Sequence, residues 1–387
     1  MVMLSRRHES GAVSLFLVVF AMLLITIVTL GFLRIMLADQ QQASLNDLSQ
    51  SAYDSSLAGV EDAKRALIYY RTVCNQGDQS ACNTQKAIIN STQCNEGLRN
   101  VVATTPNKEV QVQQSQSSND SDLNQAYTCV KMKLDTVDYL GTTQANTSKL
   151  IPLKTDSPFS TITVEWYMAE DLGTAGTAVN LISNAASKPL YLQTNWPSNR
   201  PSLMRTELMQ FGSTFTLDSF NASNSSITNS NSNTLFLYPT STTATGKIVD
   251  TANFASDVRQ TSFGAPQPVK CTSNLNAGGY ACTVTITVPQ AVNQTGSDRT
   301  AYLRLTPLYN AAHFRVTLSD GALFNGVQPS IDSTGRANDQ YRRVESRVDL
   351  IDTNFPFPEA SVDVTGNLCK DFIVTDKTSD FKDNCTP

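Results

Sequence analysis

The sequence contains none of the short motifs that mark the commonest enzyme chemistries. It has no GxxxxGK(S/T) phosphate loop, no GxGxxG dinucleotide loop, no HExxH zinc helix and no GxSxG nucleophile elbow. Histidine, the usual general base at neutral pH, occurs only twice in 387 residues. His313 lies in NAAHFRV at the expected start of a strand, and we expect it to be a hydrogen-bonded structural residue. We therefore expect the protein not to be an enzyme and to need no cofactor.

Charge is also sparse, and it is not basic. Charged residues make up 16% of the chain, and the formal net charge is -5. A nucleic-acid-binding protein would carry a basic patch or stripe, so we expect no nucleic-acid partner. The sequence contains no CxxC pair and few histidines, which disfavours a zinc site. We expect no bound metal.

Eight cysteines are present, and all of them follow residue 73. They are Cys74, Cys82, Cys94, Cys129, Cys271, Cys282, Cys369 and Cys385. An even number of cysteines beyond one point of the chain favours disulfides formed outside the cytoplasm, where thiols are not kept reduced. The cysteines cluster as four, two and two, so pairing within clusters leaves only the pairing of the first four open.

One long apolar run extends from Ala12 to Leu33. At about 1.5 Å per residue it would span roughly 33 Å, enough to cross a bilayer core of about 30 Å. A cleavable secretory signal has a shorter apolar core, about 7 to 15 residues long, followed by a small-x-small site that is missing here. Arg6 and Arg7 precede the run, so the positive-inside rule predicts a cytoplasmic N-terminus and an external head.

The residues after the run continue a helical pattern without proline. Small and apolar residues recur every three or four positions, which places them on one side of a helix. They are Leu45, Leu48, Ala52, Ser56, Val60, Ala63 and Leu67. We expect one helix over 12–72, with its transmembrane part over 12–33. Its outer part would pack this stripe on a globular head or on a neighbouring helix.

Two segments resemble a known family. The letters RRHESG ahead of Ala12 and the apolar run resemble a type III prepilin leader. SAYDSSLAGVEDAKRAL, from Ser51 to Leu67, resembles the end of the N-terminal helix in PilX-type minor pilins and GspK-type pseudopilins. The resemblance implies a leader over 1–11 and processing by a prepilin peptidase between Gly11 and Ala12. It also implies a pilin-like head, with other pilins or pilus-assembly proteins and the lipid bilayer as partners.

The sequence departs from the major pilins at one position. Major pilins carry a glutamate at the fifth mature residue, where cleavage after Gly11 would place Phe16. In the family this carboxylate neutralises the N-terminal ammonium of the preceding subunit, an ion pair suited to a dry helical core. A subunit inserted first has no predecessor, so the missing acid favours a tip or initiating subunit. The alternative is that Gly11 is never cut and the apolar run is an ordinary anchor.

Beyond the helix, the sequence predicts mainly strands. Residues 73–150 are polar, contain four cysteines and show little periodicity, and we expect a polar connection there. Residues 151–211 and 298–366 are expected to form the pilin-like β head, with 212–297 as a candidate inserted β subdomain. Residues 367–387 would form a C-terminal loop closed by the last two cysteines. The predicted fold class is α+β, a long N-terminal helix followed by a disulfide-stapled, mainly antiparallel β head.

Alternation at period two predicts individual strands in this head. Ile162, Val164 and Trp166 alternate with polar residues, as do the apolar residues of TVTITV at 283–288 and FRVTL at 314–318. We expect half-buried strands at all three places. Both tryptophans of the chain are expected to anchor the core.

Two hairpins are also expected. Cys271 and Cys282 flank TSNLNAGGYA, whose Asn and Gly residues suit a tight turn, so the cysteines would lie opposite each other on paired strands. SIDSTGRANDQYRRVESRVDL is expected to form strand, turn and strand, with Val344 on one face and charges of alternating sign on a solvated face. Asp332 and Asp339 could also be interpreted as a calcium loop, but turn geometry explains the same residues.

The sequence favours an assembly role. We expect a minor pilin-like component of a type IV pilus or a related filament, inserted in the cytoplasmic membrane by one span and acting at the tip, in initiation or in adhesion. One alternative is a pseudopilin of a secretion or DNA-uptake system. Another is a single-pass anchored protein with an extracellular binding or adhesion head and no filament. Processing after Gly11 distinguishes the filament subunits from the plain anchor.

Overall fold

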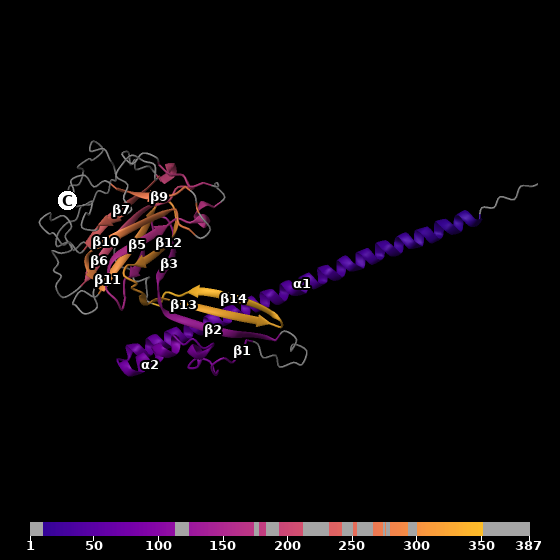
Figure 1. Cartoon of the computed structure of the whole chain (residues 1–387), viewed down its shortest axis with the longest axis horizontal. Coiled ribbons are helices and arrows are strands. Elements are labelled where there is room, and N and C mark those ends of the chain that lie inside the picture. The colour runs from indigo at the N-terminus through magenta and orange to yellow at the C-terminus, as the bar shows by residue number, and fades with distance from the viewer. Residues whose placement is uncertain are drawn as a thin grey trace, which may run out of the picture. The chain divides into compact units, whose positions relative to one another are not determined.

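The computed structural model describes residues 11–112, 124–173, 178–182, 193–211, 232–241, 251–253, 266–273, 275, 279–292 and 300–350 (Figure 1). The chain divides into two units, Met1–Thr353 and Asn354–Pro387. The second unit lies outside the described residues, and so does the predicted C-terminal loop with Cys369 and Cys385.

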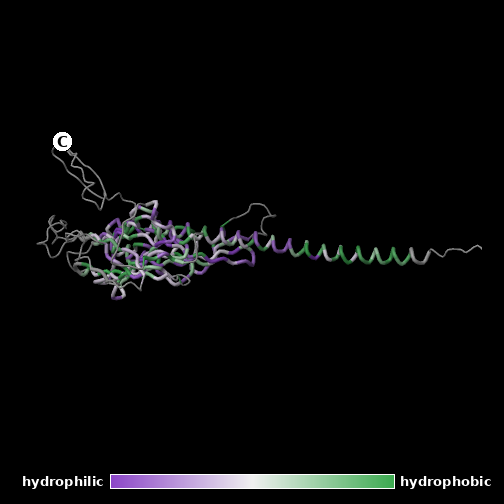
Figure 2. The backbone as a smooth tube through the Cα atoms, turned by 90° about the horizontal axis from the view of Figure 1, so that it is seen from above, coloured by the Kyte–Doolittle hydropathy of each residue, from purple (hydrophilic) through white to green (hydrophobic). Residues whose placement is uncertain are grey.

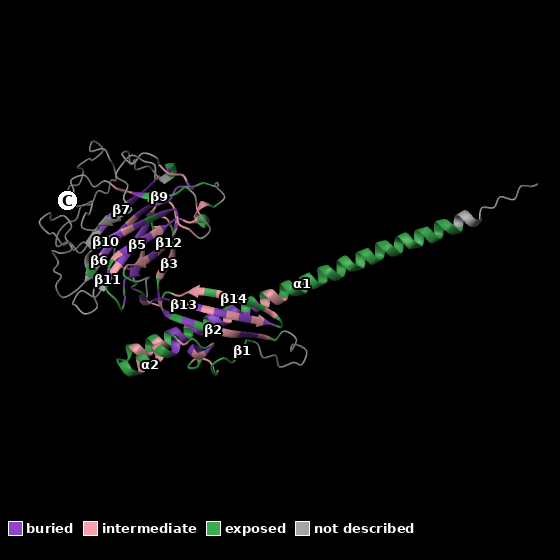
Figure 3. Ribbon diagram, viewed as in Figure 1, coloured by how far each residue is buried: buried purple, intermediate pink, exposed green. Residues whose placement is uncertain are grey.

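The first element is a helix of 65 residues, α1 (Gly11–Asn75). It confirms the long helix predicted over 12–72, and by length and composition it can cross a membrane. Its apolar side chains from Leu15 to Leu37 are all exposed, and Figures 2 and 3 show this half as hydrophobic and uncovered. The hydroxyls of Thr26 and Thr29 donate to carbonyl oxygens four residues earlier, at 2.6 Å each, which satisfies these polar groups within the helix.

Two short helices follow, α2 (Gln79–Ile89) and η1 (Glu96–Leu98). They lie in the range 73–150, where the sequence predicts a polar connection with little periodicity. The side chain of Asp78 caps α2 by accepting from the backbone N–H groups of Ser80 and Ala81. In α2 only the adjacent Ile88 and Ile89 are buried, which explains why no helical period is visible in the sequence.

Four strands form the first sheet, in the order β1-β2-β13-β14. They are β1 (Val110–Gln111), β2 (Gln125–Thr136), β13 (Phe324–Ala337) and β14 (Gln340–Arg347). All neighbours are antiparallel. The strand, turn and strand predicted near the end of the chain are confirmed as β13 and β14. Ala337 pairs with Gln340 around a tight turn in which Asn338 has a φ of 52°.

The second sheet has ten strands, and the main path runs β3-β12-β5-β10-β9-β7-β6-β11-β4, with β8 beside β10. The strands are β3 (Asp138–Thr143), β4 (Lys149–Pro152), β5 (Phe159–Trp166), β6 (Leu203–Phe211), β7 (Ser232–Ser241), β8 (Thr251–Asn253), β9 (Gln267–Cys271), β10 (Cys282–Val292), β11 (Thr300–Leu308) and β12 (Ala312–Leu318). Two 3-10 turns accompany them, η2 (Ala169–Leu172) and η3 (Gln193–Asn195). The pairing is antiparallel except for β7 with β9 and β8 with β10.

One hydrophobic core serves this second sheet. Its buried residues come from strands along the whole order, including the end strands β3 and β4. The predicted alternation is confirmed, because Ile162, Val164 and Trp166 are all fully buried. Trp166 also donates its indole N–H to the carbonyl oxygen of Ser202 at 3.0 Å. Trp196 is buried in a separate aromatic cluster, stacked on Tyr309.

The strands are partitioned differently from the expected segments. The described strands within 212–297 do not form a sheet of their own, because β10 pairs with β5 and β7 pairs with β6 in the ten-stranded sheet. The strands after residue 298 are divided between the two sheets. Partner choice depends on which strands share a core, and distance along the sequence does not reveal it.

Candidate functional site

The best-defined candidate site is the contact between the outer half of α1 and the four-stranded sheet. Small residues dominate the buried face of α1 there. The buried residues are Ala52, Ser55, Ser56, Gly59, Val60, Ala63, Ala66 and Leu67. A methyl group built on Gly335 of β13 would collide with the α1 backbone at Ala52 and Ser56. The helix and the strand therefore touch backbone to backbone, which only small residues permit.

Polar contacts fix the register of this packing. The hydroxyl of Ser333 on β13 donates to the carbonyl oxygen of Ser56 at 2.8 Å. The Arg342 side chain on β14 donates from Nε to Ser49 Oγ at 2.7 Å. Together the two contacts place the turn between β13 and β14 nearer the start of α1 than the rest of this hairpin.

A third polar contact joins α1 to β2. The Tyr127 hydroxyl donates to Asp62 Oδ2 at 2.8 Å, and the tyrosine is only 1% exposed. Burial raises the pKa of the Tyr127 phenol, and the hydrogen bond to Asp62 raises the pKa further, because ionisation would place a second negative charge beside the carboxylate.

The stripe predicted on α1 is confirmed over most of its length. Leu48 is half-buried and the residues from Ala52 to Leu67 in the stripe are buried, whereas Leu45 is exposed. The stripe ends there because the sheet ends there. All the buried residues of α1 in the described part of the chain lie within Ser51–Leu67, the segment that carries the resemblance to PilX-type and GspK-type helices.

The predicted processing residues lie at the start of α1. The helix begins at Gly11 and continues through Ala12, and their side chains are outside the described part of the chain. Phe16, at the place of the family's glutamate, is 80% exposed. Cleavage between Gly11 and Ala12 remains a prediction.

The six cysteines among the described residues form three disulfides. Cys74 pairs with Cys82 at the junction of α1 and α2, and Cys94 pairs with Cys129, joining the start of η1 to β2. This resolves the pairing that the sequence leaves open.

The third disulfide joins Cys271 and Cys282, which lie directly opposite each other on β9 and β10. The predicted opposition of these two cysteines is confirmed. All three disulfides follow the exposed apolar half of α1 in the sequence.

His313 is a hydrogen-bonded residue at the start of β12. Its Nδ1 lies 2.7 Å from Asp171 Oδ1, and its backbone N–H donates to the same carboxylate. Asp171 also accepts from the backbone N–H of Met168. The contacts tie η2 to β12, a structural arrangement of the kind predicted for this histidine.

Asp332 in the last hairpin is paired with arginine. Both carboxylate oxygens of Asp332 accept from Arg343 at 2.6 Å. Within the described residues, no group of three or more His, Cys, Asp or Glu side chains could hold a metal ion. The calcium interpretation therefore gains no support from Asp332.

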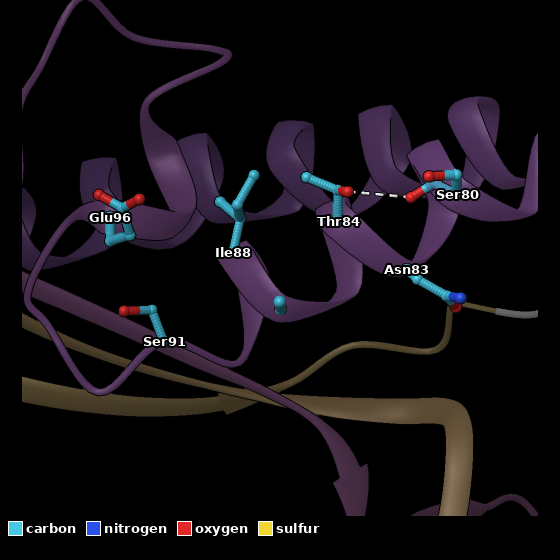
Figure 4. Close-up of a pocket in the computed structure, with 7 residues that line it drawn as sticks. Ser80, Asn83, Thr84, Ile88, Ser91 and Glu96 are labelled. Carbon is cyan, nitrogen blue, oxygen red and sulfur yellow. Dashed lines mark hydrogen bonds between the residues drawn. The ribbon is translucent and has the colours of Figure 1, made fainter.

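A polar groove of about 580 Å³ lies along the exposed side of α2 (Figure 4). Its lining consists of Ser80, Asn83, Thr84, Ala87, Ile88, Ser91 and Glu96. The Thr84 hydroxyl donates to the Ser80 carbonyl oxygen at 2.9 Å, and Glu96 accepts from Arg99 at 2.7 Å. These lining residues include no histidine, cysteine or second carboxylate, so the groove offers no catalytic pair.

Sequence reasoning missed strand β2, whose Tyr127 hydroxyl donates to Asp62 of α1. In β2, Val130, Met132 and Leu134 are buried and alternate with Lys131 and Lys133. This period-two pattern was the available signal. The small residues Ser333 and Gly335 gave no comparable signal, because Ser and Gly in a hairpin are equally typical of the turn itself.

No protein-family model matches the chain, and no curated protein or solved structure is significantly similar to it.

Proposed function

We propose that this protein is a minor pilin-like subunit of a type IV pilus or a related filament. It acts by assembly and not by catalysis. Its apolar helix half moves from the lipid bilayer into a bundle of neighbouring helices, and its β-rich head is carried outside. The observation that carries the proposal is the division of α1 into a fully exposed apolar half and a half fixed to the head.

This division suits a subunit that changes its surroundings. The exposed apolar surface from Leu15 to Leu37 has no covering in the chain's described part. In lipid it is solvated by acyl chains, and in a bundle it is covered by other helices, with Gly31 allowing a close approach. The attachment of the outer half of α1 to the four-stranded sheet keeps the head fixed to the helix both in the membrane and in the bundle.

The leader supports the same proposal. The letters RRHESG end at Gly11, where α1 begins, and a prepilin peptidase would act there on the cytoplasmic side. With Phe16 in place of the family's glutamate, the subunit has no carboxylate for a preceding ammonium. We therefore place it at the tip or in initiation, with other pilins or assembly proteins as its neighbours in the cytoplasmic membrane.

A variant at the cut tests the proposal. Gly11→Leu should block processing, because the peptidase requires a small residue before the cut. The variant should then remain in the membrane and be absent from sheared surface filaments. Gly11→Ala, which keeps a small residue, is the matched control and should enter filaments. If Gly11→Leu enters sheared filaments as well as the control does, the protein does not assemble by this route.

A further inference from the structure

No described strand pairs with the outer edge of β14 in the four-stranded sheet, and we call this edge open. β14 is the last strand in the order and has eight residues. Val348 and Leu350, which continue it, donate their backbone N–H groups to Pro329 and Val327. The backbone N–H groups of successive residues in a strand point to opposite edges. Since the N–H of Val348 points toward β13, the N–H groups of the odd-numbered residues 341–347 point away from it. No described residue accepts a hydrogen bond from them.

Two other sheet edges are protected. β1 has only two residues, which leaves little edge to pair. The edge of β3 is capped by a side chain, because the Gln328 amide accepts from the Leu140 N–H at 2.9 Å and donates to the Leu140 carbonyl oxygen at 2.7 Å. β14 is longer than either of these two edge strands.

An exposed apolar flank of α1 lies beside this open edge. Ser49 receives Arg342 of β14, and Tyr53 and Leu57 follow it at spacings of four on the same side of the helix. Tyr53, Leu57 and Ile68 are 42%, 37% and 62% exposed. Ile68 lines a groove of about 460 Å³ between α1 and residues 348–350. A strand added to β14 would place alternate side chains over this flank.

A positively charged guanidinium lies at each end of the exposed apolar flank. Arg342 lies at one end, bonded to the Ser49 hydroxyl, and Arg71 lies at the other, donating to the Leu350 carbonyl oxygen at 3.0 Å. Neither guanidinium forms an ion pair with a described carboxylate. Arg343 and Arg347, on the other face of β14, are already paired with Asp332 and Asp138.

We propose that the β14 edge binds an extended segment of a different protein as an added strand. The segment has apolar side chains directed at Tyr53, Leu57 and Ile68, and a carboxylate near each end for Arg342 and Arg71. Backbone hydrogen bonds supply affinity, and the apolar and acidic side chains supply selectivity. This partner site lies on the external part of α1 and does not depend on filament assembly.

A model peptide tests the proposal. The probe is a fluorescent peptide of alternating threonine and valine with an aspartate at each end, titrated into the full chain in lipid nanodiscs. We expect saturable binding by fluorescence anisotropy and slower hydrogen exchange in residues 341–347. The same peptide with lysine ends should bind more weakly. A peptide whose backbone nitrogens are methylated should not bind, because it cannot form the ladder.

Variants of the protein locate the site. Glu345→Pro removes an outward N–H without breaking the ladder to β13 and should abolish binding. Arg342→Ala and Arg71→Ala should each weaken binding about twofold to fivefold. Arg65→Ala, on the opposite flank of α1, is the control and should have no effect.

Three results would overturn the proposal: no binding of the aspartate-ended peptide, equal binding of the methylated peptide, or full binding by a folded Glu345→Pro variant. A dimer of the wild-type chain that Glu345→Pro dissociates would also overturn it, because the occupant would then be a second copy.

Discussion

Gly335 of β13 lies directly against the backbone of Ala52 in α1, with no room for a side chain between strand and helix. This contact joins residues far apart in the sequence. Together with the Ser333 to Ser56 hydrogen bond, it fixes the head to the helix that carries it. The account of the protein as a carried head depends on this attachment.

Gly335→Ala should therefore destabilise the head. The added methyl group must displace α1 from the sheet, and overpacking of this kind costs about 1–3 kcal/mol or more. Chemical denaturation followed by circular dichroism measures the loss. Gly31→Ala, where no atom lies within 4 Å of the added group, is the control and should not destabilise the head. Equal stability of the two variants would show that α1 and β13 are not in close contact.

Stability should fall at alkaline pH because of Tyr127. Its raised pKa means that the folded state keeps the phenolic proton after the unfolded state, with an ordinary pKa of about 10, begins to lose it. The contribution is fully present below about pH 10 and is lost as the pH rises above it. Denaturation at a series of pH values should show this decline.

Tyr127→Phe should lower stability at neutral pH by about 1–2 kcal/mol, through loss of the hydrogen bond to Asp62, and should flatten the alkaline decline. Tyr341→Phe, at an exposed tyrosine, should leave the decline unchanged. If Tyr127→Phe loses stability at alkaline pH as steeply as the wild-type protein does, groups other than Tyr127 cause the loss.

The two N-terminal disulfides should differ in their contribution. Cys94–Cys129 closes a sequence separation of 35, and Cys74–Cys82 closes one of 8. Chain-entropy arguments give about 4 kcal/mol for the longer loop and about 2.5 kcal/mol for the shorter. Paired Cys→Ser replacements, compared by thermal unfolding, should reproduce this order. The reverse order would indicate that the loop at α1 and α2 has a larger role than its length implies.

His313→Ala should affect structure and not catalysis. It removes the ring contact to Asp171 while the backbone N–H groups of residues 313 and 168 still reach that carboxylate. We expect a loss of about 1–2 kcal/mol and no loss of any enzymatic activity. A hydrolytic activity in the wild-type protein that this variant abolishes would contradict the non-catalytic interpretation.

Local patterns predicted much of the fold. The period-two alternation around Val164 and the helical stripe from Ala52 to Leu67 both correspond to buried faces, because each is determined by the chain's own geometry. The cysteine pair 271 and 282 was predictable for the same reason, since one short turn places the two residues opposite each other.

Long-range partners were not predictable. β2 pairs with β13 across an interval of about two hundred residues, as in Cys129 with Thr334, and no local signal encodes that choice. The helical half of the candidate site could be predicted from residue spacing. The sheet half could not, because it depends on Gly335 and Ser333, whose small size matters only where the helix packs against them.

The intact mass of the protein extracted from the membranes of its host tests the central claim most directly. The account predicts a mass that lacks residues 1–11, with Ala12 as the new N-terminus, in material that also occurs in sheared filaments. A mass that retains Met1, in protein confined to the membrane, would contradict it and would favour a single-pass anchored protein.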